Sequence, residues 1–384
     1  MARICLNMII KDEARVIRRC LASVRPWIDA WVIVDTGSTD GTQALVREAL
    51  RDLPGELHER PWRDFGSNRS EAIALAAGRG DYLLFLDADE SWQVPEGFRW
   101  PELTADAYAV LHRYAGMEYS RATLAATRLP WFFEGVLHEY LDCPQPHRIE
   151  PLDGPVILVR AEGARSADPA KFEKDAAVLE RALQREPDHP RHTFYLAQSY
   201  RDAGLPERSL DCYQRRIALG GWAEEVWYSL LQVALLKEGL GRPAGEVVDA
   251  YLRAYQFRPG RPETLGHLAR YCRLREDHHL AYLFASQAAS IPRTSDVLFV
   301  DPSYAQWRNR DEWSIACYWT GRYRESAQLC RELLADPRLP GEERSRVEAN
   351  LAFAERAVRV PMAAEQKTTI FRAGDTQISF APVK

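Results

Sequence analysis

The sequence predicts an α/β domain with a mostly parallel, Rossmann-like sheet, followed by an all-α domain of helical repeats. In roughly the first ninety residues, short apolar runs alternate with amphipathic helical patterns, as in parallel sheets with helical crossovers. From about residue 169 onward the strand patterns end, and apolar residues recur with helical spacing. A length of 384 residues also favours two domains over one.

Four apolar runs predict the strands of the first domain. They cover residues 4–10, 30–34, 56–60 and 81–86, with helices expected between them over residues 14–24, 42–50 and 67–77. Two runs end in an acid, Asp35 and Asp87, and ligands of α/β sheets bind at the carboxyl ends of strands. We therefore expect these two acids in one crevice. Ser38 and Asp40 are expected to cap the helix that begins near Thr42.

The fourth run ends in the sequence Asp87-Ala88-Asp89-Glu90. A buried strand does not stabilise clustered carboxylates unless positive charge accompanies them, and a divalent cation is the usual source of that charge. The pattern therefore predicts a metal that holds a phosphorylated substrate. The chain has no Gly-x-Gly-x-x-Gly loop, which argues against a dinucleotide-dependent dehydrogenase.

The composition narrows the class of protein further. With 46% hydrophobic and 27% charged residues, the chain is typical of a soluble globular protein, and its net charge of −5 gives no reason to expect a nucleic-acid partner. No apolar run approaches the roughly eighteen residues that cross a bilayer, and the N-terminus lacks a signal-peptide pattern. We therefore expect a cytoplasmic protein without a transmembrane segment.

Four segments in order resemble the family 2 glycosyltransferases, which have the GT-A fold. They cover residues 8–13, 31–42, 64–69 and 80–90. The resemblance implies that Asp35, with Thr36 beside it, contacts the base or ribose of a nucleotide. It implies that Lys11 and Glu13 lie along the nucleoside.

The same resemblance assigns roles to residues of the third and fourth segments. Arg69 is expected to reach the nucleotide. Asp87 is expected to bind the ribose, and Asp89 a divalent metal, Mn²⁺ or Mg²⁺.

Residues 133–139, Phe-Glu-Gly-Val-Leu-His-Glu, are similar to a Gly-x-x-His-Glu element of bacterial relatives that include lipopolysaccharide-core transferases and repeat-bearing transferases. Transfer requires a group that takes the acceptor's proton, and the candidates are Glu139, His138 and Glu134, in that order. His138 is instead a candidate third metal ligand beside Asp89 and Asp87, because neutral imidazole binds Mn²⁺ and similar ions.

The helical part follows the 34-residue spacing of the tetratricopeptide repeat (TPR). We expect a GT-A domain over residues 1–165, a TPR-like domain over 166–360, and a tail over 361–384 with a hairpin pattern about Gly374-Asp375. Helical pairs of this kind stack into a solenoid whose concave surface binds extended peptides or proteins.

Together, these observations predict a metal-dependent, inverting glycosyltransferase. Its donor would be a nucleotide-diphosphate sugar, with a UDP-sugar expected, and its acceptor a peptide or protein captured by the repeats, as in bacterial transferases that glycosylate bacteriocin peptides. One alternative is a lipopolysaccharide-core or other glycan acceptor, with repeats or tail that form a homodimer. A second alternative, a non-enzymatic scaffold with a decayed transferase domain, is disfavoured because Asp35, Asp87 and Asp89 are all present.

Overall fold

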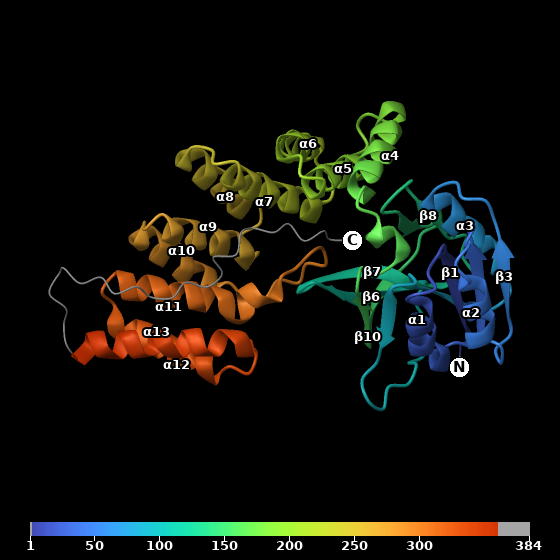
Figure 1. The fold of residues 1–384 in the computed structure, drawn as a ribbon, viewed down its shortest axis with the longest axis horizontal. Coiled ribbons are helices and arrows are strands. Elements are labelled where there is room, and N and C mark those ends of the chain that lie inside the picture. The colour runs from blue at the N-terminus through green and yellow to red at the C-terminus, as the bar shows by residue number, and fades with distance from the viewer. Residues whose placement is uncertain (1, 360–384) are drawn as a thin grey trace. The chain divides into compact units, whose positions relative to one another are not determined.

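The computed structural model describes residues 2–359, and the predicted hairpin of residues 361–384 lies outside them. The chain forms two compact units that divide after Cys212 (Figure 1). The first unit contains the sheet and the first helices, and the second contains most of the helical repeats. The first compact unit therefore extends past residue 165, where the sequence predicts the end of the GT-A domain. That domain boundary stays a prediction.

The first unit is built on an eight-stranded sheet with the strand order β3-β2-β1-β4-β7-β6-β10-β5. Parallel pairing joins strands β3, β2, β1 and β4, and it also joins β6 and β10. Strands β7 and β5 run antiparallel to their neighbours. This confirms the predicted mostly parallel sheet. The strands are β1 (Ile4–Ile10), β2 (Ala30–Asp35), β3 (Gly55–Glu59), β4 (Tyr82–Phe85), β5 (Glu90–Gln93), β6 (Ala107–Tyr114), β7 (Met117–Ala126) and β10 (Ile149–Val159).

Helices cover both faces of this sheet because the side chains of each strand alternate in direction. On one face, Ile4 and Leu6 belong to the core that α1 and α2 complete. On the other, Cys5 belongs to a second core, with residues from the end of α3 and from the β8–β9 hairpin. The elements are α1 (Ile17–Val24), α2 (Thr42–Ala49), α3 (Phe65–Leu75), β8 (Phe132–Glu134) and β9 (Tyr140–Asp142).

The repeat helices follow β10 without further strands in the described residues. They are α4 (Lys171–Arg185), α5 (Pro190–Asp202), α6 (Pro206–Leu219), α7 (Ala223–Gly239), α8 (Ala244–Phe257), α9 (Pro262–Leu274), α10 (His278–Ser290), α11 (Asn309–Trp319), α12 (Tyr323–Ala335) and α13 (Gly341–Arg359). From α7 to α13, each helix packs on the next, as expected of stacked helical pairs. No helix within residues 2–359 is long and apolar enough to cross a membrane.

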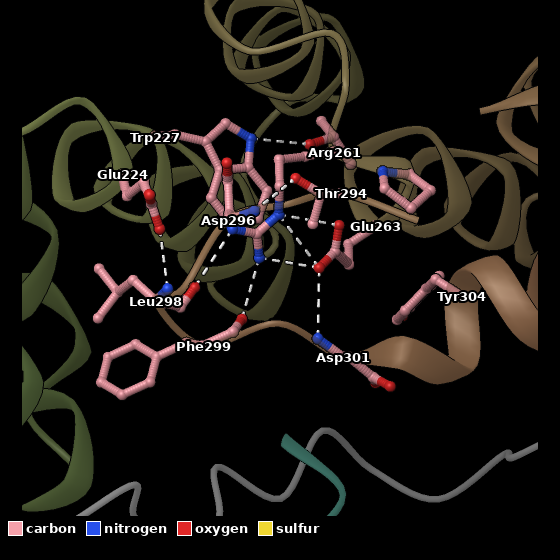
Figure 2. Close-up of polar contacts among 12 residues, drawn as sticks. Glu224, Trp227, Arg261, Glu263, Thr294, Asp296, Leu298, Phe299, Asp301 and Tyr304 are labelled. Atoms are coloured by element: carbon pink, nitrogen blue, oxygen red, sulfur yellow. Dashed lines mark hydrogen bonds and ion pairs between the residues drawn. The ribbon is translucent and has the colours of Figure 1, made fainter. Parts of the chain in front are cut away.

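The connection between α10 and α11, residues 291–303, is longer than the others in the second unit and is held by buried charges (Figure 2). The Arg261 side chain is fully buried, lies 3.6 Å above the Trp227 ring and pairs with Glu263 at 2.8 Å and Asp296 at 3.2 Å. It also donates hydrogen bonds to the carbonyls of residues 298 and 299. These contacts fix the connection against the repeats.

Candidate active site

The loops that follow β1 and β2 are joined by hydrogen bonds at the carboxyl edge of the sheet. The amide of Asp12 donates to the Ser38 hydroxyl at 2.8 Å, and the amide of Glu13 donates to the Thr42 hydroxyl at 2.8 Å. Helix α2 begins at Thr42 with Gly41, which has no side chain, as its N-cap. The capping predicted for Ser38 is wrong, because its hydroxyl accepts the Asp12 amide of the β1 loop instead. Asp40 does bind the start of α2, since its Oδ1 accepts the Thr42 amide at 3.0 Å while its Oδ2 accepts the Ala14 amide at 2.9 Å.

Asp35, the last residue of β2, is fully buried. Its Oδ1 accepts hydrogen bonds from the amides of Gly37 and Ser38, each at 2.8 Å, whereas Oδ2 has no partner among residues 2–359. The neighbouring Thr36 hydroxyl donates to the carbonyl of Ile10 at 3.1 Å. Asp35 therefore keeps one unsatisfied carboxylate oxygen, while Thr36 joins the ends of β1 and β2.

Arg69 of α3 links two segments that are far apart in the sequence. Its Nε donates to Glu139 at 2.5 Å, and its Nη2 forms an ion pair with Asp87. Helix α3 lies close to the loop before Glu139, since a Cβ atom on Gly66 would be 2.4 Å from the carbonyl oxygen of Gly135. This close approach lets one buried guanidinium contact the exit of β4 and the His-Glu element.

Arg121 of β7 is a second arginine at this site, and no local sequence pattern singled it out. Its Nη2 lies 2.9 Å from Glu90 and 3.5 Å from Asp87. Burial raises the pKa of Glu90 to about 7, with the negative charges of Asp87 and Asp89 adding to the rise and Arg121 opposing it. Glu90 thus resists ionisation in the folded chain.

Asp89 and Glu13 lie on either side of the chain at Gly163. Asp89 Oδ2 accepts the Gly163 amide at 3.3 Å, and Glu13 Oε2 accepts the Ala164 amide at 3.2 Å. Carboxylate oxygens are the ligands that Mg²⁺ and Mn²⁺ prefer, so this donor set fits a hard divalent cation. Lys11, at the same edge of the sheet, is exposed.

Charged side chains of both signs gather at this edge of the sheet. Among the described residues, the carboxylates of Asp87, Glu90 and Glu139 form ion pairs with the guanidiniums of Arg69 and Arg121. Within residues 2–359, no three His, Cys, Asp or Glu side chains form a group that could hold a metal ion. The metal roles of Asp87, Asp89 and His138 stay predictions.

His138 is held by the first helical pair. Its ring stacks on Tyr195 of α5 at 3.9 Å, and its carbonyl accepts a hydrogen bond from Arg191 at 2.9 Å. Its φ of 54° is in the left-handed region, which is costly for a residue with a side chain and is often found at functional sites. Removal from water, and then the positive charges of Arg165, Arg191 and Lys171, hold the pKa of His138 well below its usual range.

No sequence pattern indicates that α5 contacts this loop, because its helical period is that of the predicted repeat domain. The third base candidate, Glu134, is the last residue of β8 and pairs through its backbone with Tyr140 of β9. Within the described chain, its carboxylate has no ion-pair partner, unlike that of Glu139. The structure thus brings Arg69, Asp87 and Glu139 together and leaves Glu134 outside that network.

The fold and this site define a glycosyltransferase domain followed by tetratricopeptide repeats. Residues 5–96 match the family Glycosyl transferase family 2. The TPR repeat-containing protein Synpcc7942_0270 of Synechococcus elongatus is 33% identical over 317 residues, which cover 76% of this chain and 76% of that protein. The chain belongs to the family of this protein.

Other similarities cover smaller shares of the chain. An uncharacterized glycosyltransferase of Rickettsia felis is 33% identical over 90 residues, which cover 23% of this chain and 30% of that protein. A solved tetratricopeptide repeat protein from Parabacteroides merdae has a TM-score of 0.37 and 17% identity, over 50% of this chain and 71% of that one. The MamA crystal structure has a TM-score of 0.35 and 15% identity, over 50% and 88%.

Proposed function

We propose that the chain is a metal-dependent, inverting glycosyltransferase that moves a sugar from a nucleotide-diphosphate donor, expected to be a UDP-sugar, to a peptide or protein acceptor. The observation that carries this proposal is the arrangement around Arg69. One buried guanidinium contacts both Asp87, expected at the donor ribose, and Glu139, the first base candidate. Groups expected to serve the donor and the acceptor thus share one positioning side chain.

On the donor side, the unsatisfied Oδ2 of Asp35 is suited to accept a hydrogen bond from the base or ribose. Asp89 and Asp87 would hold the cation, which when bound neutralises negative charge on the departing diphosphate. Lys11 and Glu13 come from the loop that follows β1, at the same edge of the sheet, where the nucleoside is expected.

On the acceptor side, Glu139 is the proposed general base. Arg69 occupies its Oε1, and Oε2 has no partner within residues 2–359, so Oε2 is the oxygen suited to take the proton of the attacking group. Attack on the face opposite the departing diphosphate inverts the anomeric carbon. His138 is the second candidate. Its lowered pKa keeps the ring neutral near pH 7, while burial and the neighbouring positive charges disfavour the imidazolium that would form on proton transfer, so it ranks below Glu139.

The donor part of the proposal is tested with UDP-, GDP- and dTDP-sugars in the presence and absence of Mn²⁺. A donor that binds the folded chain raises its melting temperature through mass action. We expect a metal-dependent rise and slow hydrolysis with one nucleotide, and both lost in Asp89→Ala. Full activity of Asp89→Ala, or of the wild type in excess chelator, would contradict the metal-dependent mechanism.

The acceptor part is tested with a chain that ends after Gly221. This shorter chain keeps α4 to α6, and therefore Tyr195 against His138, but lacks the later repeats. We expect it to hydrolyse the donor and to lose transfer to the peptide acceptor. Unchanged transfer would refute acceptor capture by α7 to α13 and would favour a dimerising role for them.

A further inference from the structure

The connection between β10 and α4 lies against the acidic edge of the sheet. In this connection, the Gly163 amide donates to Asp89 at 3.3 Å and the Ala164 amide donates to Glu13 at 3.2 Å. Two successive backbone N–H groups thus bind carboxylates that follow two different strands, β4 and β1. No sequence motif predicted this contact.

Neighbouring residues hold the same segment from three helices. Glu162 pairs with Arg19 of α1 at 2.6 Å. The Arg165 guanidinium lies 4.8 Å from the Phe65 ring at the start of α3, and it pairs with Asp175 of α4. Because α4 belongs to the first helical pair, the segment connects that pair directly to the acids.

Gly163 is favoured by the proximity of Glu13 and not by backbone conformation. Its φ of −63° and ψ of 164° are extended values that any residue adopts. A Cβ atom at this position, however, would lie 3.1 Å from both carboxylate oxygens of Glu13 and 3.4 Å from Asp89 Oδ2. The Asp89 distance is an ordinary van der Waals contact, whereas the Glu13 carboxylate would have to shift by a few tenths of an ångström.

We propose that Gly163 and Ala164 are positioning residues that orient the carboxylates of Asp89 and Glu13 for a divalent cation. This inference rests on the proposed function and adds Glu13 to the groups that face the cation. Each amide fixes one carboxylate oxygen and so directs the other. Hydrogen bonds of this kind to ligating carboxylates raise metal affinity by holding the ligands in place before binding.

The test is Ala164→Pro in the full chain, with Mn²⁺ alone as the probe in isothermal titration calorimetry. Proline removes the amide that binds Glu13, yet it suits the first position of a helical turn and the extended Gly163 before it. The control is Ala164→Ser, which keeps the amide. We expect Ala164→Pro to bind Mn²⁺ about tenfold more weakly, the effect of one hydrogen bond to a charged group, with the metal-free melting temperature unchanged.

Gly163→Ala is a second variant that keeps both amides and adds only the methyl group. We expect a smaller loss of Mn²⁺ affinity in the same direction, because the Glu13 carboxylate must shift by a few tenths of an ångström. If both variants bind Mn²⁺ as the wild type does, while Asp89→Ala does not, the inference fails and the proposed function stands. If Asp89→Ala leaves wild-type Mn²⁺ binding unchanged, both fail.

Discussion

Two buried arginines organise the two units of this protein in contrasting ways. Arg69 lies among acids that remain partly open to water, since the Asp87 side chain is 34% exposed. Arg261 is fully buried, and the side chains of its partners Glu263 and Asp296 are each 4% exposed (Figure 2). The first network is thus partly open to water, whereas the second is enclosed.

The difference shows which buried charges point to chemistry. Arg261 satisfies its donors on two carboxylates and two backbone carbonyls, so it stabilises a connection and leaves nothing to bind a ligand. Around Arg69, Glu139 keeps one unpaired oxygen within the described chain. We therefore expect damage to the first network to affect rate, and damage to the second to affect stability.

The largest expected effect is that of Glu139→Gln on the transfer rate. Loss of a general base slows transfer about 10²–10⁴-fold, with little change in donor affinity. The matched control is Glu71→Gln, which removes another arginine-paired glutamate of the first unit. Steady-state kinetics and donor titration measure the two quantities, and equal losses in both variants would show that Glu139 has no special role.

Loss of Mn²⁺ affinity in His138→Ala, but not in Glu139→Gln, would assign His138 to the metal.

The second prediction concerns Arg261→Ala. Removing this side chain leaves Glu263 buried without its cation, while Asp296 keeps its ion pair with Arg258. Breaking a buried pair in this way typically costs about 3–5 kcal/mol of unfolding free energy. Arg331→Ala, which breaks an exposed pair with Glu355, is the control and should change stability by under about 1 kcal/mol. Urea unfolding followed by circular dichroism measures both. If Arg261→Ala changes donor affinity and leaves stability unchanged, the network around Arg261 serves ligand binding and the contrast with Arg69 is wrong.

The sequence predicted the fold well because its signals are local. Strand exits at Asp35 and Asp87 follow apolar runs, and the repeats follow a helical period, so neither depends on knowing which distant segments meet. Both β2 and β4 pair with β1, which places these two acids at one edge of the sheet as expected. The resemblance supplied the family, but the roles of individual residues stay predictions.

What the sequence missed came from contacts between distant segments. Arg121 reaches the acids because β7 pairs with β4. Tyr195 reaches His138 because helix α5 packs against the loop that precedes β9. Gly163 and Ala164 bind the acids through their backbone amides, so no pattern of side chains in the sequence predicts these contacts. The capping predicted for Ser38 was wrong because a neighbouring loop supplied a better-placed donor, the amide of Asp12.

A third, smaller effect would test whether α5 belongs to the active site. Tyr195→Ala removes the ring that stacks on His138, and such pairs contribute about 0.5–1.5 kcal/mol. We expect transfer to fall by roughly 2- to 10-fold. Tyr195→Phe keeps the ring and should transfer at the wild-type rate. If Tyr195→Ala transfers as fast as Tyr195→Phe, α5 contributes to the fold and not to the active site.

The smallest expected effect is a pH dependence that arises from Glu90. Its pKa is raised to about 7 in the folded chain, above the ordinary 4.5, so the folded state holds this proton more tightly than the unfolded state does. The associated stability is fully present below about pH 4.5 and is lost as the pH rises through 7. Glu90→Gln cannot ionise. Between pH 5 and pH 8, the wild type should therefore lose melting temperature relative to this variant, by on the order of a few degrees. Parallel melting curves across that range would mean that Glu90 ionises normally and that Arg121 compensates fully for its burial.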